Sequence, residues 1–202
     1  SVLAVAAVQA GEMAEFSAYY QASTNGISGS AERHLIKLDE DSYRLNISLE
    51  AKMAGVSIGD LEQASEFSVA AGEIKPQHYS YQISGVKRES HAISFNWDAN
   101  IALSVEDEQS WTVALQDGAL DQLSYQQALT QALNAQSFAT GSELTFQLVD
   151  GGELETQRFR ILGNEVLATP MGNFDSVKLE RIREDDSGRS TTIWLASDWR
   201  YL

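Results

Sequence analysis

Alternation of apolar and polar residues with a period of two runs through most of this 202-residue chain. In residues 43–50 the apolar positions are Tyr43, Leu45, Ile47 and Leu49, and polar residues stand between them. Such a period predicts a strand with one buried face and one solvated face. Turn-forming pairs such as Asn25-Gly26 separate these segments. The sequence therefore predicts a mainly β protein with about ten strands.

One segment, "LDQLSYQQALTQALNAQ" at residues 120–136, instead has the spacing of an α-helix. Its apolar face would carry Tyr125, Leu129 and Leu133, so the helix is expected to be amphipathic and to bury one side only. Ser124 and Gln127 have the spacing of a capping box at its start. We expect this helix to cover a single strongly curved antiparallel sheet, or open barrel, either as a lid over a ligand cavity or as ordinary core cover.

Composition narrows the classes of function. Fourteen lysines and arginines against 29 acidic residues give a formal charge of −15, which disfavours binding to nucleic-acid phosphates. Cysteine is absent, which excludes disulfides and thiolate chemistry. No run approaches the ~18 apolar residues of a membrane-spanning helix, so no transmembrane segment is predicted.

The first ten residues, "SVLAVAAVQA", are small and apolar, and they do not begin with methionine. Val8 and Ala10 have the spacing of a signal-peptidase recognition site. We therefore interpret residues 1–10 as a signal-peptide remnant, although an edge strand or short helix would have a similar composition. The remaining residues, 11–202, are expected to form one β domain that is periplasmic or otherwise exported in a bacterium.

No catalytic or cofactor motif is evident. His34, His78 and His91 stand alone, without the spacing of a metal site, and each is expected to be structural. Neither a serine-hydrolase elbow nor a glycine-rich phosphate loop is present. A pair of acidic residues facing across a cleft could still support glycan hydrolysis, but sequence alone cannot place such a pair. We therefore predict no catalytic residue, metal or cofactor.

Aromatic residues on the predicted strands are the remaining candidates for ligand binding. Large flat rings with a polar edge can line an apolar cavity or stack on sugars, but in strands they more commonly fill the core. The candidates are Tyr79, Tyr81, Trp97, Trp111 and Trp194.

Several segments resemble a known family in their order and spacing. They include "YYQASTNGISG", "YSYQISGVKRES", "GALDQLSYQQAL", "VDGGELETQRFRILGNEVLATPMGNFDSVKLER" and "TTIWLASDWRYL". Over residues 16–202 the chain is similar to the bacterial family called domain of unknown function 3108. The resemblance implies an exported protein and no assigned reaction. It also implies a further strand after "WLASDWRYL", so this chain is expected to lack its last strand.

These observations lead to three hypotheses. The first is a non-catalytic envelope protein that binds or carries an apolar or amphiphilic ligand, such as a lipid, or assists envelope assembly. The second is a module that binds or processes a glycan. The third is a structural domain that binds a protein partner.

Overall fold

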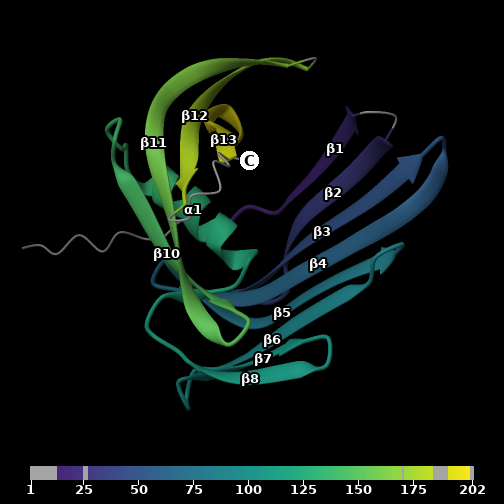
Figure 1. Ribbon diagram of the computed structural model, residues 1–202. Coiled ribbons are helices and arrows are strands. Elements are labelled where there is room, and N and C mark those ends of the chain that lie inside the picture. Colours follow the sequence, from purple (N-terminus) through teal and green to yellow (C-terminus); the bar gives the residue numbers. More distant parts are fainter. Residues whose placement is uncertain (1–12, 25–26, 170, 184–190, 201–202) are drawn as a thin grey trace, which may run out of the picture.

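The computed structural model describes residues 13–24, 27–169, 171–183 and 191–200, and most of its strands belong to one large antiparallel sheet. The eight strands of this sheet follow one another in sequence order, each hydrogen-bonded to the next. They are β1 (Phe16–Thr24), β2 (Ile27–Lys37), β3 (Ser42–Met53), β4 (Val56–Ala70), β5 (Glu73–Gly85), β6 (Glu89–Asn96), β7 (Ile101–Glu106) and β8 (Gln109–Ala114). The sheet is strongly curved and does not close (Figure 1).

A second, smaller sheet has the strand order β13-β12-β11-β10-β9. Its strands are β9 (Ala119–Leu120), β10 (Glu143–Asp150), β11 (Glu153–Thr169), β12 (Gly172–Ile182) and β13 (Thr191–Ala196). Only β9 pairs in parallel, with β10. The α-helix α1 (Ser124–Ala135) lies between the two sheets, and a 3₁₀ helix, η1 (Ser197–Trp199), follows β13 (Figure 1).

The predicted fold class is confirmed: the described chain is mainly β and antiparallel, with an open sheet and one α-helix. It differs from the expectation in having thirteen described strands in two sheets rather than about ten in one. The reason lies between residues 115 and 142. There the chain leaves β8, forms β9, which pairs with β10, and then forms α1 before the four other strands of the second sheet.

The helix packs between two hydrophobic clusters. Leu129 and Leu133 belong to the cluster of the second sheet, whereas Leu123, just before the helix, belongs to that of the large sheet. Gln127 and Thr130 are also buried. The prediction that the helix buries one side only is therefore wrong, because a helix between two sheets is covered on more than one face.

The start of the helix also differs from the prediction. Ser124 is its first residue, and no side-chain hydrogen bond comes from the capping position, Leu123. Instead, Asp121 accepts hydrogen bonds through Oδ1 from the backbone N–H groups of Leu123 and Ser124, both at 2.8 Å. The Ser124 hydroxyl accepts one in return from the N–H of Asp121 at 2.9 Å. The reciprocal pair of a capping box is present, but it begins three residues earlier than predicted.

Some expectations fall on residues that the structure does not describe. The predicted signal-peptide remnant, residues 1–10, and the predicted turn at residues 25–26 both lie outside the described ranges. Within the described part of the chain, no helix is both long and apolar enough to traverse a bilayer.

Candidate functional site

The inner face of the large sheet, which faces the helix, can be followed as rows of residues paired across the strands. Directly paired residues lie on the same face of a sheet. The innermost row is buried and forms part of the core: Leu35, Leu45, Ser65, Tyr79, Ile93 and Ser104. The next row, which we call the boundary row, separates the core from the exposed part: Arg33, Ile47, Gln63, Tyr81, His91 and Glu106. The boundary row is mostly polar and has its acidic end at β7.

At this acidic end two pockets adjoin, with volumes of about 450 and 530 Å³. They share Glu106 and Asp150, so the first carboxylate comes from the large sheet and the second from the end of β10. The first pocket is lined by Gln63, Tyr79, Tyr81, Glu89, Ser90, His91, Glu106, Asp107, Gln122 and Asp150. The second is lined by Glu106, Trp111, Asp150, Gly151, Gly152 and Glu153. This lining is too polar and too acidic to suit an apolar ligand.

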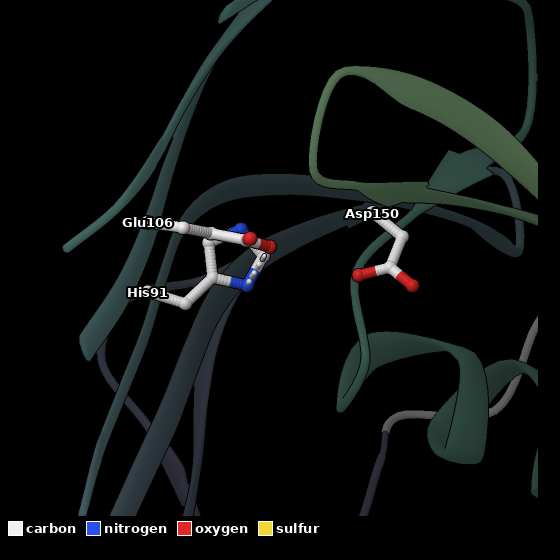
Figure 2. Close-up of side chains that lie close together, drawn as sticks. All are labelled: His91, Glu106 and Asp150. Carbon is white, nitrogen blue, oxygen red and sulfur yellow. Dashed lines mark ion pairs between the residues drawn. The ribbon is translucent and has the colours of Figure 1, made fainter. Parts of the chain in front are cut away.

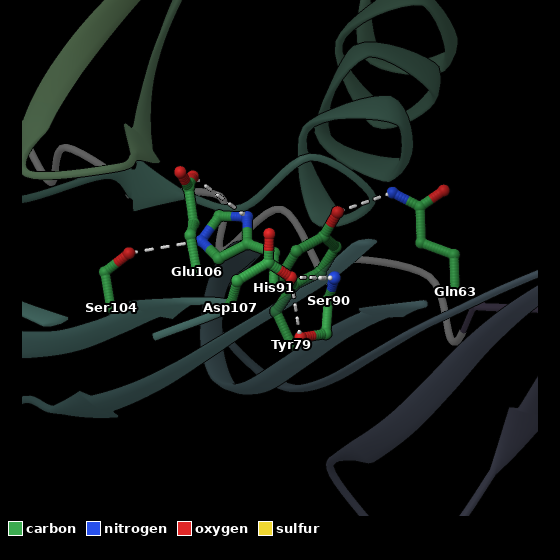
Figure 3. Close-up of polar contacts among 7 residues, drawn as sticks. All are labelled: Gln63, Tyr79, Ser90, His91, Ser104, Glu106 and Asp107. Atoms are coloured by element: carbon green, nitrogen blue, oxygen red, sulfur yellow. Dashed lines mark hydrogen bonds and ion pairs between the residues drawn. The ribbon is translucent and has the colours of Figure 1, made fainter. Parts of the chain in front are cut away.

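His91 is held in a defined orientation within the first pocket (Figure 3). Its Nε2 lies 3.1 Å from the Ser104 hydroxyl, and its ring meets the Tyr79 ring edge-on, with centroids 5.5 Å apart. Its Nδ1 points toward Glu106, whose Oε1 is 3.7 Å away. Burial lowers the pKa of His91, and the nearby Glu106 carboxylate opposes this only in part. The imidazole is therefore neutral at neutral pH.

His91 lies between the Ser104 hydroxyl and the Glu106 carboxylate, as the histidine of a serine-hydrolase triad does. The geometry does not support that chemistry. The Ser104 side chain is fully buried, at 0% exposure, so no substrate carbonyl can reach its hydroxyl. The gap of 3.7 Å between His91 and Glu106 is also too long for the hydrogen bond that orients a catalytic base. Ser104 instead positions the His91 ring.

Tyr79 and Tyr81, two of the predicted aromatic residues, line the first pocket. The Tyr79 hydroxyl accepts a hydrogen bond of 2.7 Å from Gln63 Nε2, and burial raises the pKa of this phenol, so it stays protonated (Figure 3). Trp111 lies in the adjoining pocket, against Gly152 of the turn between β10 and β11. These three aromatic residues therefore border the same junction.

The other two predicted aromatic residues lie elsewhere. Trp97 stacks on Phe95 and donates a hydrogen bond of 2.7 Å to the backbone carbonyl of Pro76. Trp194 donates a hydrogen bond to Glu165, and Lys178 lies 5.0 Å from its ring centroid. Neither lines either pocket.

The three residues predicted to form a lid are packed in the interior. Leu129 and Leu133 contact the cluster that contains Phe159, and the Tyr125 ring stacks on Phe159 with centroids 5.9 Å apart. The helix therefore covers the second sheet as well as the large one, and its apolar residues do not line either pocket.

Beyond the boundary row, the inner face of β1–β5 is apolar but uncovered. The next row is Ala31, Leu49, Leu61 and Ile83, and the row after it holds only Gly29, Ala51, Gly59 and Gly85. Tyr20, Leu49 and Met53 on this face are 45%, 39% and 49% exposed. In Figure 1 the ends of β1–β4 extend well past α1. We call this surface the open inner face.

Arg33 stands where the open inner face meets the core. The guanidinium carbon lies 5.5 Å from the centroid of the Phe16 ring, and the side chain hydrogen-bonds Tyr20. Its Nε is buried without a hydrogen-bond partner. Burial lowers the pKa of Arg33, since none of the described carboxylates forms an ion pair with it. Arg33 is half-buried and has no counter-ion among the described residues, so its guanidinium can pair with an anionic group.

Fold and site together define a class: a two-sheet, mainly antiparallel β protein with one interior helix, a polar pocket at the sheet junction and an open apolar face. Residues 15–202 match the family described as "Protein of unknown function (DUF3108)", and the chain belongs to this family. No protein with a curated description matches the sequence.

Among solved structures, the chain is similar to the "Beta-barrel-like Protein of Domain of Unknown Function DUF1849 from Brucella abortus". The two share 10% sequence identity with a TM-score of 0.49, and the match covers 88% of this chain and 80% of the other.

Sequence reasoning missed the polar residues of the site. The sequence holds a signal for one pair: residues 97–100, "WDAN", are the turn between β6 and β7, and counting outward from this four-residue turn places His91 opposite Glu106. Asp150 gives no such signal, because it reaches the site from the other sheet. Arg33 was missed because its half-buried position and its lack of a described counter-ion depend on the packing around it.

Proposed function

We propose that this protein is a non-catalytic envelope protein that binds an amphiphile on its open inner face, with the acidic headgroup at Arg33. The observation that carries the proposal is the uncovered apolar surface beside a half-buried arginine that has no counter-ion among the described residues. Residues 1–10, the expected signal remnant, support a location outside the cytoplasm.

The dimensions of the open inner face suit a long apolar chain. Residues 27–33 of β2 span about 20 Å at ~3.3 Å per residue. The row of Gly29, Ala51, Gly59 and Gly85 has almost no side chains, so an acyl chain can lie close to the backbone there. Burial of apolar surface contributes about 25 cal/mol per Å² and would drive binding.

The experiment is a titration of the purified protein with a long-chain fatty acid and with the alcohol of equal length. Leu49→Asp should abolish binding of both ligands, because it places a charge in the apolar surface. Arg33→Gln should weaken binding of the fatty acid by at least about tenfold and leave binding of the alcohol unchanged.

Two matched variants serve as controls. Asn46→Asp places the same charge on the opposite face of β3, and Lys52→Gln removes a cation that pairs with Glu50 on that opposite face. Both should bind like the wild type. Failure of the wild-type protein to bind the fatty acid, or unchanged binding by Leu49→Asp, would refute the proposal.

A glycan ligand is the second candidate, and the junction pockets favour it. Tyr79 and Tyr81 line one pocket and Trp111 lines the other, among carboxylates that can accept hydrogen bonds from sugar hydroxyls. Binding on a glycan array that is lost in Trp111→Ala and kept in Leu49→Asp would favour this candidate. An absence of both fatty-acid and glycan binding would favour a domain that binds a protein partner.

A further inference from the structure

We propose that His91, Glu106 and Asp150 bind a divalent transition-metal ion, with Zn²⁺ as the best fit, at the junction between the two sheets. This site is separate from the open inner face. Figure 2 shows His91 and Glu106 projecting from the large sheet toward Asp150, the last residue of β10 in the other sheet. The ion would therefore be held by both sheets.

The first support is the distance between the donor atoms. One ligand atom from each of the three side chains lies within 4.8 Å of the other two. Bonds from Zn²⁺ to nitrogen and oxygen are about 2.0–2.2 Å long, so two ligand atoms on a tetrahedral ion are roughly 3.4 Å apart. The donor atoms need to approach one another by at most about 1.4 Å, a movement within the reach of side-chain rotation.

The second support is the state of His91. Its side chain is only 10% exposed, and its Nδ1 faces the carboxylates without a hydrogen bond, since Glu106 is 3.7 Å away. The Ser104 hydroxyl beside Nε2 can accept a hydrogen bond from that nitrogen, in the tautomer that metal binding at Nδ1 requires. That tautomer leaves the lone pair of Nδ1 directed at the site, and such an outer hydrogen bond commonly orients histidine ligands of metals.

The third support is the local charge. No lysine or arginine is among the described residues that line the two pockets, whereas five acidic residues are: Glu89, Glu106, Asp107, Asp150 and Glu153. Asp150 also lies near Glu155, and burial together with this neighbouring carboxylate raises the pKa of Glu155. A divalent cation would reduce the repulsion among these carboxyl groups.

The donor set selects the kind of ion. One imidazole nitrogen and two carboxylates suit Zn²⁺, and Mn²⁺ less well, because imidazole binding strengthens from manganese toward zinc. Ca²⁺ and Mg²⁺ prefer sites made entirely of oxygen ligands. Three protein ligands leave at least one coordination position free, toward the pocket lined by Gln63 and Tyr79.

The test is calorimetric titration of untagged protein with Zn²⁺, Mn²⁺ and Ca²⁺, together with thermal unfolding at each ion concentration. One Zn²⁺ per chain should bind, more tightly than Mn²⁺, with no measurable Ca²⁺ binding. The melting temperature should rise with Zn²⁺ concentration, because the ion binds only the folded arrangement of both sheets. Asp150→Asn and His91→Gln should each weaken Zn²⁺ binding by at least about tenfold.

Two variants distinguish this site from nonspecific binding. Glu73→Gln removes a negative charge outside both pockets, and it should bind Zn²⁺ like the wild type. His34→Gln removes a surface histidine that pairs with Glu32, and it should also leave binding unchanged. The proposal is overturned if Asp150→Asn binds Zn²⁺ like the wild type, or if His34→Gln is the variant that loses binding.

Discussion

Asp121 is a fully buried carboxylate that joins helix α1 to the large sheet. Its Oδ1 accepts the N–H groups of Leu123 and Ser124, and its Oδ2 accepts the hydroxyl of Ser65 on β4 at 2.7 Å. A carboxylate at this position also suits the partial positive charge of a helix N-terminus. One residue therefore satisfies three buried donors from two elements.

Replacing Asp121 should be far more damaging than replacing Ser124. Asp121→Ala leaves three donors without an acceptor, and each buried unsatisfied group costs about 1–3 kcal/mol. Ser124→Ala removes one acceptor and should cost about 0.5–2 kcal/mol, the usual range for a helix cap. Urea unfolding midpoints of both variants check the order. Equal shifts would show that the Asp121 contacts do not determine the stability of the helix.

Titration of Asp121 should also make the free energy of unfolding depend on pH. Burial raises the pKa of this carboxyl group above the 3.8 of an exposed aspartate, despite the hydrogen bonds that oppose the shift. The folded state therefore takes up a proton at a higher pH than the unfolded state. Asp121 then contributes stability that is fully present below pH 3.8 and is lost as the pH rises through the folded-state pKa.

Asp121→Asn lacks this titration and provides the comparison. The free energy of unfolding of the wild type minus that of Asp121→Asn should be larger at about pH 4.5 than at about pH 7. The difference should depend little on salt, because the group is buried. A difference that shrinks as the pH falls would mean that the folded-state pKa of Asp121 is lowered instead.

At the scale of the element, helix α1 owes its position to the cluster formed with the second sheet. Leu129 packs there with Phe159, Ile161 and Leu179. Leu129→Ala should cost about 2–5 kcal/mol, the usual result of emptying a leucine site in a core. Leu129→Asp should cost more, because it also buries a charge that has no partner.

Ala135→Asp is the control for the helix, since Ala135 is exposed in its last turn. A negative charge there opposes the helix dipole and should cost at most about 1 kcal/mol. The three unfolding midpoints, measured in urea, should fall in the order Ala135→Asp, Leu129→Ala, Leu129→Asp, from the highest to the lowest. Similar midpoints for Leu129→Asp and Ala135→Asp would show that the helix does not pack on this cluster.

Period-two patterning predicts which face of a strand is apolar, but not how far along the strand that face is covered. In β3, Tyr43 and Leu45 are buried while Leu49 of the same series is 39% exposed. The difference depends on where α1 and the second sheet end. For the same reason the sequence predicts a helix within residues 120–136 but not that Gln127 and Thr130 are buried.

At the scale of the whole molecule, the two sheets meet at the turn that contains Gly151 and Gly152. A Cβ placed on Gly152 would lie 2.8 Å from Cδ1 of Trp111 on β8. This contact fixes the distance between the turn and the large sheet. Asp150 lies in the same turn, so the contact also sets its distance from His91 and Glu106.

Gly152→Ala should therefore disturb the whole junction. The added methyl group cannot fit without moving either the Trp111 ring or the turn, and overpacking of this kind costs about 1–3 kcal/mol. The urea midpoint should fall and the tryptophan emission should shift. If Asp150 is a Zn²⁺ ligand, the affinity for Zn²⁺ should also fall, because the turn that carries it is displaced.

Gly29→Ala is the matched control. A Cβ there would lie 3.6 Å from the backbone oxygen of Glu50, an ordinary contact, in a strand far from the junction. It should be neutral, or should stabilise the protein by up to about 1 kcal/mol, because alanine has less conformational freedom than glycine in the unfolded chain. If Gly152→Ala were as stable as Gly29→Ala and its tryptophan emission unchanged, Trp111 and the turn would not be in contact in solution. The junction would then lack the close packing between sheets that places Asp150 opposite His91.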